Sequence, residues 1–203
     1  MTISAHEPRT YRTRMARPGL VGFRVVVKET DLWVLAARDF SPEVRDLVIQ
    51  ERQQLEAYIA GHPGFLTTLI PWPADRFAPA VVREMIEAAR AAGVGPMAAV
   101  AGALAARVGL NLDPSLSPLG VCTSSASVGH SLSFGRADAA CVLAESAALA
   151  DAAATALGNR VQGTDTIAPA LEWAAALPDI LGAVVIVGEK LGAWGRVELT
   201  PLA

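Results

Sequence analysis

Apolar residues near the two ends of the chain follow the pattern of β-hairpins. Residues 23–28 (FRVVVK) and 31–36 (DLWVLA) are β-branched and aromatic runs separated by two polar residues, which is typical of a hairpin with a tight turn. Residues 180–187 (ILGAVVIV) predict a buried strand, and residues 196–199 predict a strand that returns against it after a glycine-containing loop. Residues 139–143 predict one more short strand.

Helical spacing and helix-boundary residues fill the sequence between these hairpins. Ser41 and Pro42 supply an N-cap and a first-turn proline, and Gly61 and Gly93 follow the ends of two apolar-periodic segments. The predicted helices are residues 41–59, residues 80–92, a segment that begins after Pro96, residues 147–160 and residues 167–177.

Hairpins at both ends, with helices between them and no strict alternation of strand and helix, predict an α+β fold with a mixed or largely antiparallel sheet. Much of the apolar content is alanine, which favours helices that pack closely. We expect a single domain over residues 1–203, with residues 1–20 as a polar lead-in.

The composition excludes several classes of protein. Hydrophobic residues make up 52% of the chain and charged residues 18%, so most of the chain is expected to fold. The formal net charge is −3 without any basic block, which argues against a nucleic-acid surface. The apolar runs are too short for a membrane span and the N-terminus lacks the apolar region of a signal peptide. Cys122 and Cys141 have neither metal-binding nor redox spacing, so reduced thiols in a cytoplasmic protein are expected.

A stretch rich in hydroxyl groups is the first candidate site. Five hydroxyls, a thiol and an imidazole lie within ten residues after position 121, and such a loop can offer hydroxyl and backbone N–H donors to a phosphate. The candidate ligand-binding residues are Thr123, Ser124, Ser125, Ser127 and Gly129. His130 is the candidate acid or base, because imidazole titrates near neutral pH. The alternatives are a serine-rich turn that satisfies its own backbone, a structural histidine and, for Cys122, an inert buried thiol.

Two further features could bind a metal or an anion. Asp151 and Thr155 are separated by four residues on a predicted helix, so their oxygens share a face that suits Mg²⁺. The alternative is a capping aspartate and an ordinary helical threonine. Gly93 and Gly95 precede a helix N-terminus, and such ends attract anions. Close packing is the competing explanation for these glycines.

Several motifs together resemble a known group of proteins. They are KETDL (28–32), HPGF (62–65), GVGPMAAVAGALA (93–105), GVCTSS with GHSLSFGRAD (120–138) and LADAAATALGN (149–159). They resemble an uncharacterised protein family grouped with the ApbE-like superfamily, whose characterised members are FAD:protein FMN transferases. The resemblance extends from about Tyr11 to the C-terminus and implies an ApbE-like fold with Mg²⁺ and FAD or FMN as cofactors.

The resemblance also implies roles for individual residues. The transferases hold magnesium on a D-x-x-x-T motif, to which Asp151 and Thr155 are similar, and their TSG…HH segment resembles Thr123-Ser124 and His130 here. The lysine that follows their glycines is absent, since Met97 and the next residue stand there, and this departure removes support for contacts to a flavin diphosphate.

A second departure lies just before Gly120. Members of the family carry a strand segment that ends in a GGD-type turn, whereas here residues 109–113 run almost directly into residues 118–120. The loss of central strands would leave buried edges unpaired. We therefore favour the interpretation that a segment near residues 110–117 is missing from the sequence as given, and not that the protein has lost it.

These observations predict an ApbE-like protein that handles a flavin or another nucleotide. One hypothesis is a Mg²⁺-dependent transferase or hydrolase, and the alternative is a protein that binds a small phosphorylated ligand without turnover. A third alternative is a structural protein whose alanine-rich helices form an oligomer interface. A homodimer is expected only from the general frequency of two-fold assemblies.

Overall fold

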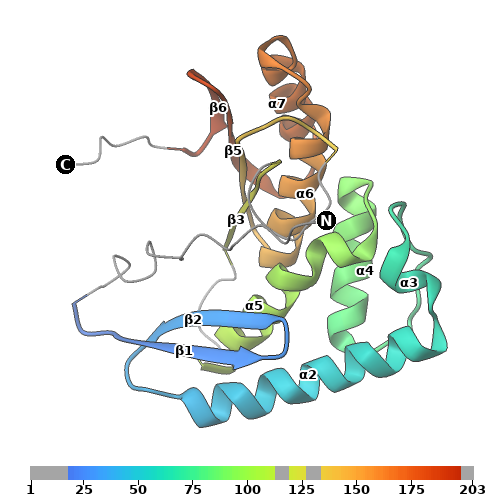
Figure 1. Ribbon diagram of the computed structural model, residues 1–203, viewed down its shortest axis with the longest axis vertical. Helices are drawn as coiled ribbons and strands as arrows, with labels where there is room; N and C mark the ends of the chain where they lie inside the picture. The colour runs from blue at the N-terminus through green and yellow to red at the C-terminus, as the bar shows by residue number, and fades with distance from the viewer. Residues whose placement is uncertain (1–17, 113–118, 127–133, 198–203) are drawn as a thin grey trace, which may run out of the picture. The chain divides into compact units, whose positions relative to one another are not determined.

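The computed structural model describes residues 18–112, 119–126 and 134–197 of the chain (Figure 1). Contacts group the chain into two compact units, Met1–Gln50 and Glu51–Ala203, and each is described by itself. The predicted α+β class is confirmed, because helices accompany two antiparallel sheets. The predicted lead-in lies largely outside the described residues, and the expectation of a single domain stays a prediction.

The first unit contains the N-terminal hairpin. Strands β1 (Val21–Val27) and β2 (Thr30–Ala36) pair in antiparallel register, with Val27 opposite Thr30. The turn is therefore Lys28–Glu29, and Lys28 takes a positive φ of 51°. The next helix, α2 (Ser41–Gly61), begins in this unit. The buried apolar side chains of the unit are Phe23, Val25, Val44 and Val48.

The second unit contains a four-stranded antiparallel sheet in the order β3-β4-β5-β6. Its strands are β3 (Gly120–Ser124), β4 (Ala139–Ala144), β5 (Ile180–Val187) and β6 (Lys190–Gly195). Two sequence predictions are wrong here. Residues 122–124 form part of a strand rather than a loop, and the strand that returns against β5 is β6 rather than residues 196–199. The reason is the turn after Val187, where Gly188 takes a φ of 58° and places Lys190 directly opposite Val187.

The helices of the second unit form the remaining layers. They are α3 (Gly64–Thr67), α4 (Ala80–Ala92), the 3₁₀ turn η1 (Pro96–Ala99), α5 (Val100–Leu112), α6 (Ala147–Arg160), the 3₁₀ turn η2 (Thr164–Thr166) and α7 (Ile167–Ala175). α3 is a short helix that is not among the helices predicted from the sequence. α6 and α7 lie on the same side of the sheet (Figure 1), and α4 and α5 pack on other sides of α6.

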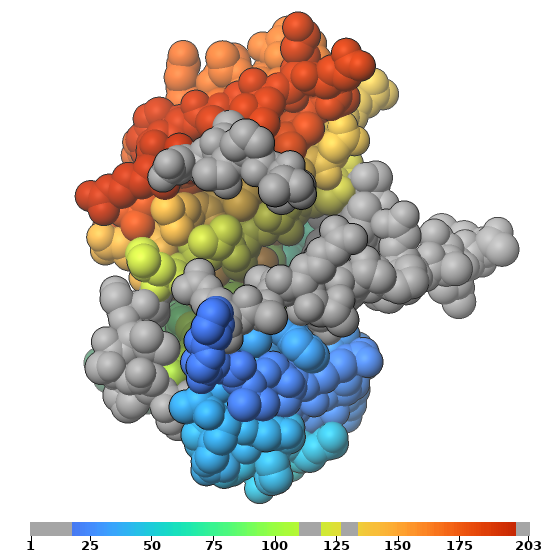
Figure 2. All heavy atoms as spheres, turned by 90° about the vertical axis from the view of Figure 1, so that its left-hand side faces the viewer, coloured from blue at the N-terminus to red at the C-terminus, as the bar shows by residue number. Residues whose placement is uncertain are grey.

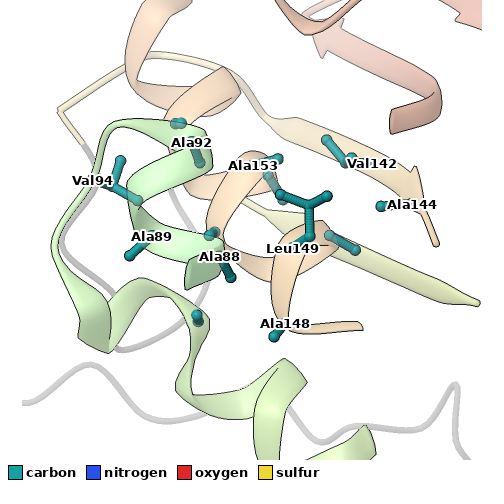
Figure 3. Close-up of a cluster of buried hydrophobic side chains, with 14 of the residues drawn as sticks. Ala88, Ala89, Ala92, Val94, Val142, Ala144, Ala148, Leu149 and Ala153 are labelled. Carbon is teal, nitrogen blue, oxygen red and sulfur yellow. The ribbon is translucent and has the colours of Figure 1, made fainter. Parts of the chain in front are cut away.

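Small side chains dominate the interior around α6. Figure 3 shows Ala148, Leu149 and Ala153 of α6 between apolar residues of α4 and of β4. The fully or nearly fully buried residues of α6 are Ala148, Leu149, Ala150, Ala152, Ala153, Ala154, Ala156, Leu157 and Gly158. Because alanine fills little space, neighbouring backbones come close to this helix on several sides.

No single helix in the described ranges is long and apolar enough to cross a membrane. The pair Ala80–Ala92 and Pro96–Gly109 reaches that length and apolarity only in combination, across a bend of 106°.

Candidate functional site

The first turn of α6 is the point where three elements of the candidate site meet. The Ser146 hydroxyl caps this turn by accepting the N–H of Leu149 at 3.3 Å. A Cβ on Gly102 of α5 would lie 2.1 Å from the carbonyl oxygen of Ala147, and a Cβ on Gly120 of β3 would lie 2.3 Å from the Cα of Ala147. Glycine at both positions is what allows α5 and β3 to contact α6 directly.

Asp151, one turn further along α6, is half-buried and lies against the start of α5. Its Oδ2 accepts the backbone N–H of Gly102 at 2.9 Å, and the N–H of Ala101 also donates to this carboxylate. Burial raises the pKa of Asp151 from 3.8 to about 6, and the two N–H donors oppose the rise. The carboxylate therefore caps the N-terminus of α5, whose unpaired N–H groups and dipole favour a negative charge.

Thr155 lies on the same stripe of α6 as Asp151, and this stripe faces β3. Ala147 at one end of the stripe contacts Gly120, as described above, and at the other end a Cβ on Gly158 would lie 3.6 Å from the Ser124 Oγ. The Thr155 side chain is half-buried. The predicted shared face of Asp151 and Thr155 is thus directed at a strand.

Strand β3 divides the hydroxyl-rich sequence between two faces of the sheet. Cys122 and Ser124 point toward α6, whereas Thr123 points to the opposite side and is exposed. The Cys122 thiol donates toward the carbonyl oxygen of Ala147 at 3.7 Å. Burial raises the pKa of Cys122 to about 12, with further contributions from Asp151 and Cys141, so the thiol stays protonated at neutral pH. We call Cys122, Ser124, Asp151 and Thr155 the β3–α6 seam.

The segment that contains Ser127, Gly129 and His130 lies outside the described residues, but both of its ends are described. At one end the N–H of Ala126 donates to the carbonyl of Ala137 at 2.9 Å. At the other end the N–H of Phe134 donates to the Asn159 Oδ1 at 2.9 Å, and the Gln162 side chain donates to the carbonyls of Phe134 and Asn159 at 3.0 Å. The segment therefore returns to the sheet beside the C-terminal end of α6. Ser125, which precedes it, is half-buried.

The two candidate glycines before α5 have structural roles. Gly93 ends α4 in the left-handed conformation, with a φ of 72°, and its N–H bonds to the carbonyls of Ala89 and Arg90. A Cβ on Gly95 would lie 1.9 Å from the carbonyl oxygen of Thr68, so this glycine allows a close backbone contact. The N–H groups of the first turn of α5 are already engaged by Asp151. Contact of Gly93 or Gly95 with a ligand stays a prediction.

Sequence reasoning missed three members of this arrangement. Gly102 supplies the N–H that binds Asp151, and Asn159 with Gln162 anchors the end of the hydroxyl-rich segment. The sequence signal that could have identified Gly102 is the run of small residues around it. Such a run indicates a close helix contact, but it does not show which element is in contact.

The oxygens of the seam fit Mg²⁺ in type, although they are few. Asp151 and Thr155 offer a carboxylate and a hydroxyl, which are ligands that Mg²⁺ accepts together with water and phosphate oxygens. Within the described ranges no group of three or more His, Cys, Asp and Glu side chains could hold a metal ion. A metal at Asp151 and Thr155 would thus need oxygens from water, from a ligand or from backbone carbonyls.

Comparison with known proteins finds one matching family model and a set of relatives. The model described as "AbpE bacteria" matches two overlapping segments, residues 12–115 and 107–178. A UPF0280 protein of Methanocella arvoryzae is 38% identical over 213 aligned positions, which include 84% of this chain and 87% of that protein. A UPF0280 protein of Methanopyrus kandleri is 39% identical over 223 positions, with 87% and 91% included, and one of Methanocaldococcus jannaschii is 34% identical over 220, with 86% and 90%. The names of these relatives state a family and no activity.

Proposed function

Because this chain belongs to the AbpE bacteria family, whose relatives' names give no reaction, we propose a function from the β3–α6 seam itself: Mg²⁺-dependent binding of a small phosphorylated ligand. A flavin nucleotide, FAD or FMN, is the first ligand to test, because the motifs described above resemble the ApbE-like superfamily. A binding function is common to the transferase hypothesis and to its non-catalytic alternative.

The observation that carries this proposal is the carboxylate of Asp151. Burial of a carboxylate opposes its ionisation, and here the pKa rises to about 6 although two N–H groups bind the carboxylate. A neutral asparagine could accept the same N–H bonds at the α5 N-terminus without that cost. A half-buried carboxylate with a raised pKa, beside a second oxygen donor, is the kind of group that metal and ligand sites retain.

The residues of the seam would divide the work of binding between them. Asp151 and Thr155 would hold Mg²⁺, which neutralises phosphate charge when it is bound. The Ser124 hydroxyl, on the same side of β3, would donate to a phosphate oxygen. Ser127, Gly129 and His130 belong to a segment that returns beside the C-terminal end of α6, so contact of these residues with the same phosphate remains part of the proposal. Thr123 points to the other side of the sheet and would not take part.

Turnover is a separate question from binding. The lysine of the transferases is replaced by Met97, which favours the non-catalytic alternative. Release of FMN or AMP from FAD in the presence of Mg²⁺ would establish the transferase or hydrolase hypothesis, and ligand binding without release would establish the alternative.

The test of the binding function is a thermal shift series with FAD, FMN and ADP, each with and without Mg²⁺. A ligand at a hundred times its Kd stabilises a protein by about 2.7 kcal/mol, which for a chain of this length raises the Tm by roughly 5–11 °C. We expect such a rise for at least one ligand, and only with Mg²⁺ present.

The decisive variant is Asp151→Asn, which keeps an acceptor for the α5 N-terminus and removes the charge. If Asp151 binds Mg²⁺, this variant folds normally and loses the Mg²⁺-dependent shift. Asp46→Asn, an exposed helical aspartate, is the matched control and should retain the full shift. A Mg²⁺-dependent shift that survives in Asp151→Asn, or the absence of any shift in the wild type, would contradict the proposal.

A further inference from the structure

Glu51, in the second half of α2, has a buried carboxylate with one unpartnered oxygen. Among the residues that the structure describes, it is the one charged residue that is buried, with 5% of its surface exposed. Its Oε1 lies 3.4 Å from the Nε of Arg107 in α5. Its Oε2 is buried and accepts no hydrogen bond from the described part of the chain. An unsatisfied carboxylate oxygen inside a protein is costly, so a donor is expected to face it.

The inward side of α2 carries this carboxylate. The outward side is polar and exposed, as at Gln53 and Glu56, and Figure 2 shows the helix in light blue to cyan at the surface. Leu55 and Tyr58, one and two turns beyond Glu51, belong to the apolar core that also contains residues of α4 and α5. Because residues spaced in this way share one side of a helix, Glu51 faces the same two helices. All three belong to the second unit, of which Glu51 is the first residue.

The carboxyl group of Glu84 in α4 is a neighbour that can supply the donor. Glu84 is half-buried, and this burial raises its pKa above 4.5. The charge of Arg107 opposes the rise in pKa, and the charges of Glu51 and Glu87 add to it. The effect of Glu51 places the two carboxyls near each other, because one charge alters the pKa of another group mainly at short range. When it is protonated, a carboxyl group has an O–H donor that the ionised form lacks.

The charged groups around this pair favour a proton shared between the two carboxyls. From α5, Arg107 contributes one positive charge, which can balance one carboxylate but not two. On α2, the neighbouring Arg52 forms an ion pair with Glu56 at 3.0 Å. On α4, the further group is Glu87, which is exposed and negative. Two ionised carboxylates would therefore repel each other, whereas a carboxylate and a carboxylic acid would not.

We propose that Glu84 keeps a proton at a pH where an exposed glutamate is ionised, and donates it to the Oε2 of Glu51. The two carboxyls and Arg107 then form one charge-balanced contact that joins α2, α4 and α5. The O–H of Glu84 satisfies the buried oxygen, and the guanidinium neutralises the remaining charge. As the pH rises, loss of this proton leaves both carboxyls negative and weakens the attachment of α2 to the other helices. The contact is therefore responsive to pH.

The first experiment follows the side-chain carboxyl carbons of the full chain by ¹³C NMR as a function of pH, with Glu84→Gln used to assign the Glu84 signal. We expect a titration midpoint for Glu84 above 4.5 in the wild type. Glu51→Gln removes the repelling charge and leaves Arg107 to Glu84, so the midpoint should fall to 4.5 or below. Glu172→Gln, at an exposed position of α7, removes the same charge elsewhere and is the matched control, with an unchanged midpoint.

The second experiment measures amide hydrogen exchange in the second half of α2. The amide of Glu84→Gln can donate to Glu51 at every pH, whereas the carboxyl of the wild type loses its donor as the pH rises. At about pH 8, peptides from residues 51–61 should therefore exchange several-fold more slowly in this variant than in the wild type. At about pH 5 the two proteins should exchange alike, since both then carry a donor. Peptides from α7 are the internal reference and should not differ between the proteins at either pH.

Neither substitution changes the size of the side chain, and neither residue belongs to the β3–α6 seam, so the outcome does not depend on ligand binding there. A Glu84 midpoint near 4.5 in the wild type would overturn the proposal, because a buried water would then be the donor to Glu51. An unchanged Glu84 midpoint in Glu51→Gln would overturn it as well. If Glu51→Gln does not fold, the exchange of residues 51–61 in Glu84→Gln still tests the contact, and equal exchange with the wild type at both pH values contradicts it.

Discussion

At the scale of single residues, Asp151 combines a structural and a proposed ligand-binding role. Its carboxylate binds N–H groups at the start of α5, and its pKa is raised to about 6 by burial. The sequence prediction of a shared face with Thr155 followed from helical spacing alone and is consistent with the position of both on the stripe that faces β3. The bond to Gly102, which is 49 residues away, could not be predicted, because a sequence does not state which helix end an isolated aspartate will cap.

The pKa of Asp151 predicts a specific dependence of stability on pH. Between pH 3.8 and about 6 the folded protein keeps a proton on Asp151 that the unfolded chain has released, so this group lowers stability as the pH rises through that window. Its effect is on the order of 3 kcal/mol and is constant above the window. In Asp151→Asn this contribution is absent, so the variant should be at least as stable as the wild type at pH 7.

Urea unfolding of both proteins between pH 4 and pH 7 checks this prediction, and the quantity to compare is the difference between the two curves. Other carboxyls whose pKa is lowered, such as that of Asp39 through its bonds to Ser41, contribute equally to both curves and cancel. Parallel curves for wild type and variant would show that Asp151 titrates normally.

Cys122 gives a second prediction at this scale. Because burial and the neighbouring Asp151 raise its pKa to about 12, very little thiolate exists at neutral pH. Alkylation of Cys122 by iodoacetamide at pH 7.5 should therefore be at least tenfold slower in the folded protein than in urea, as measured by mass spectrometry of the Cys122 peptide. Rapid alkylation in the folded state would mean that the thiol is activated rather than inert.

At the scale of secondary-structure elements, the sequence predicted helices better than strands. α4 and α6 carry their own boundary signals, such as Gly93 and Ser146, and their bounds agree with the prediction within a few residues. β3 and β6 were missed because each contains glycine, one residue in β3 and two in β6, and glycine disfavours strands. These two segments become strands because β4 and β5 pair with them, which is an effect of partners distant in sequence.

Two glycines of α5 differ in their contact with α6, so their replacement by alanine should have opposite effects on stability. Gly102→Ala in α5 would place a Cβ 2.1 Å from the carbonyl oxygen of Ala147, so helix and neighbour must separate, and we expect a loss of about 3 kcal/mol or failure to fold. Gly109→Ala in the same helix meets nothing within 4 Å and should stabilise the protein by about 0.5–1 kcal/mol through helix propensity. Chemical denaturation measures both. Equal effects of the two substitutions would show that α5 does not contact α6 as described.

At the scale of the whole molecule, a short junction before β3 leads into a four-stranded sheet, and of the described helices α6 and α7 lie on one side of that sheet (Figure 1). The sequence indicated the junction, because residues 109–113 lead almost directly to Gly120. The sequence could not indicate which side of the sheet these helices cover, since the positions of β4 and β5 on the two sides are equally apolar and only the register separates them.

The alanine-rich surface of α6 has a consequence for how this protein can change over generations. A helix whose neighbours approach to backbone contact leaves no room for a longer side chain on most of its sides. Neutral drift at the buried alanines of α6 is therefore confined to glycine, alanine and serine, while the exposed positions of β3 and β6 can exchange more freely. If the seam binds the proposed ligand, new specificities would therefore arise from its strand side, with the helix as the half that changes less.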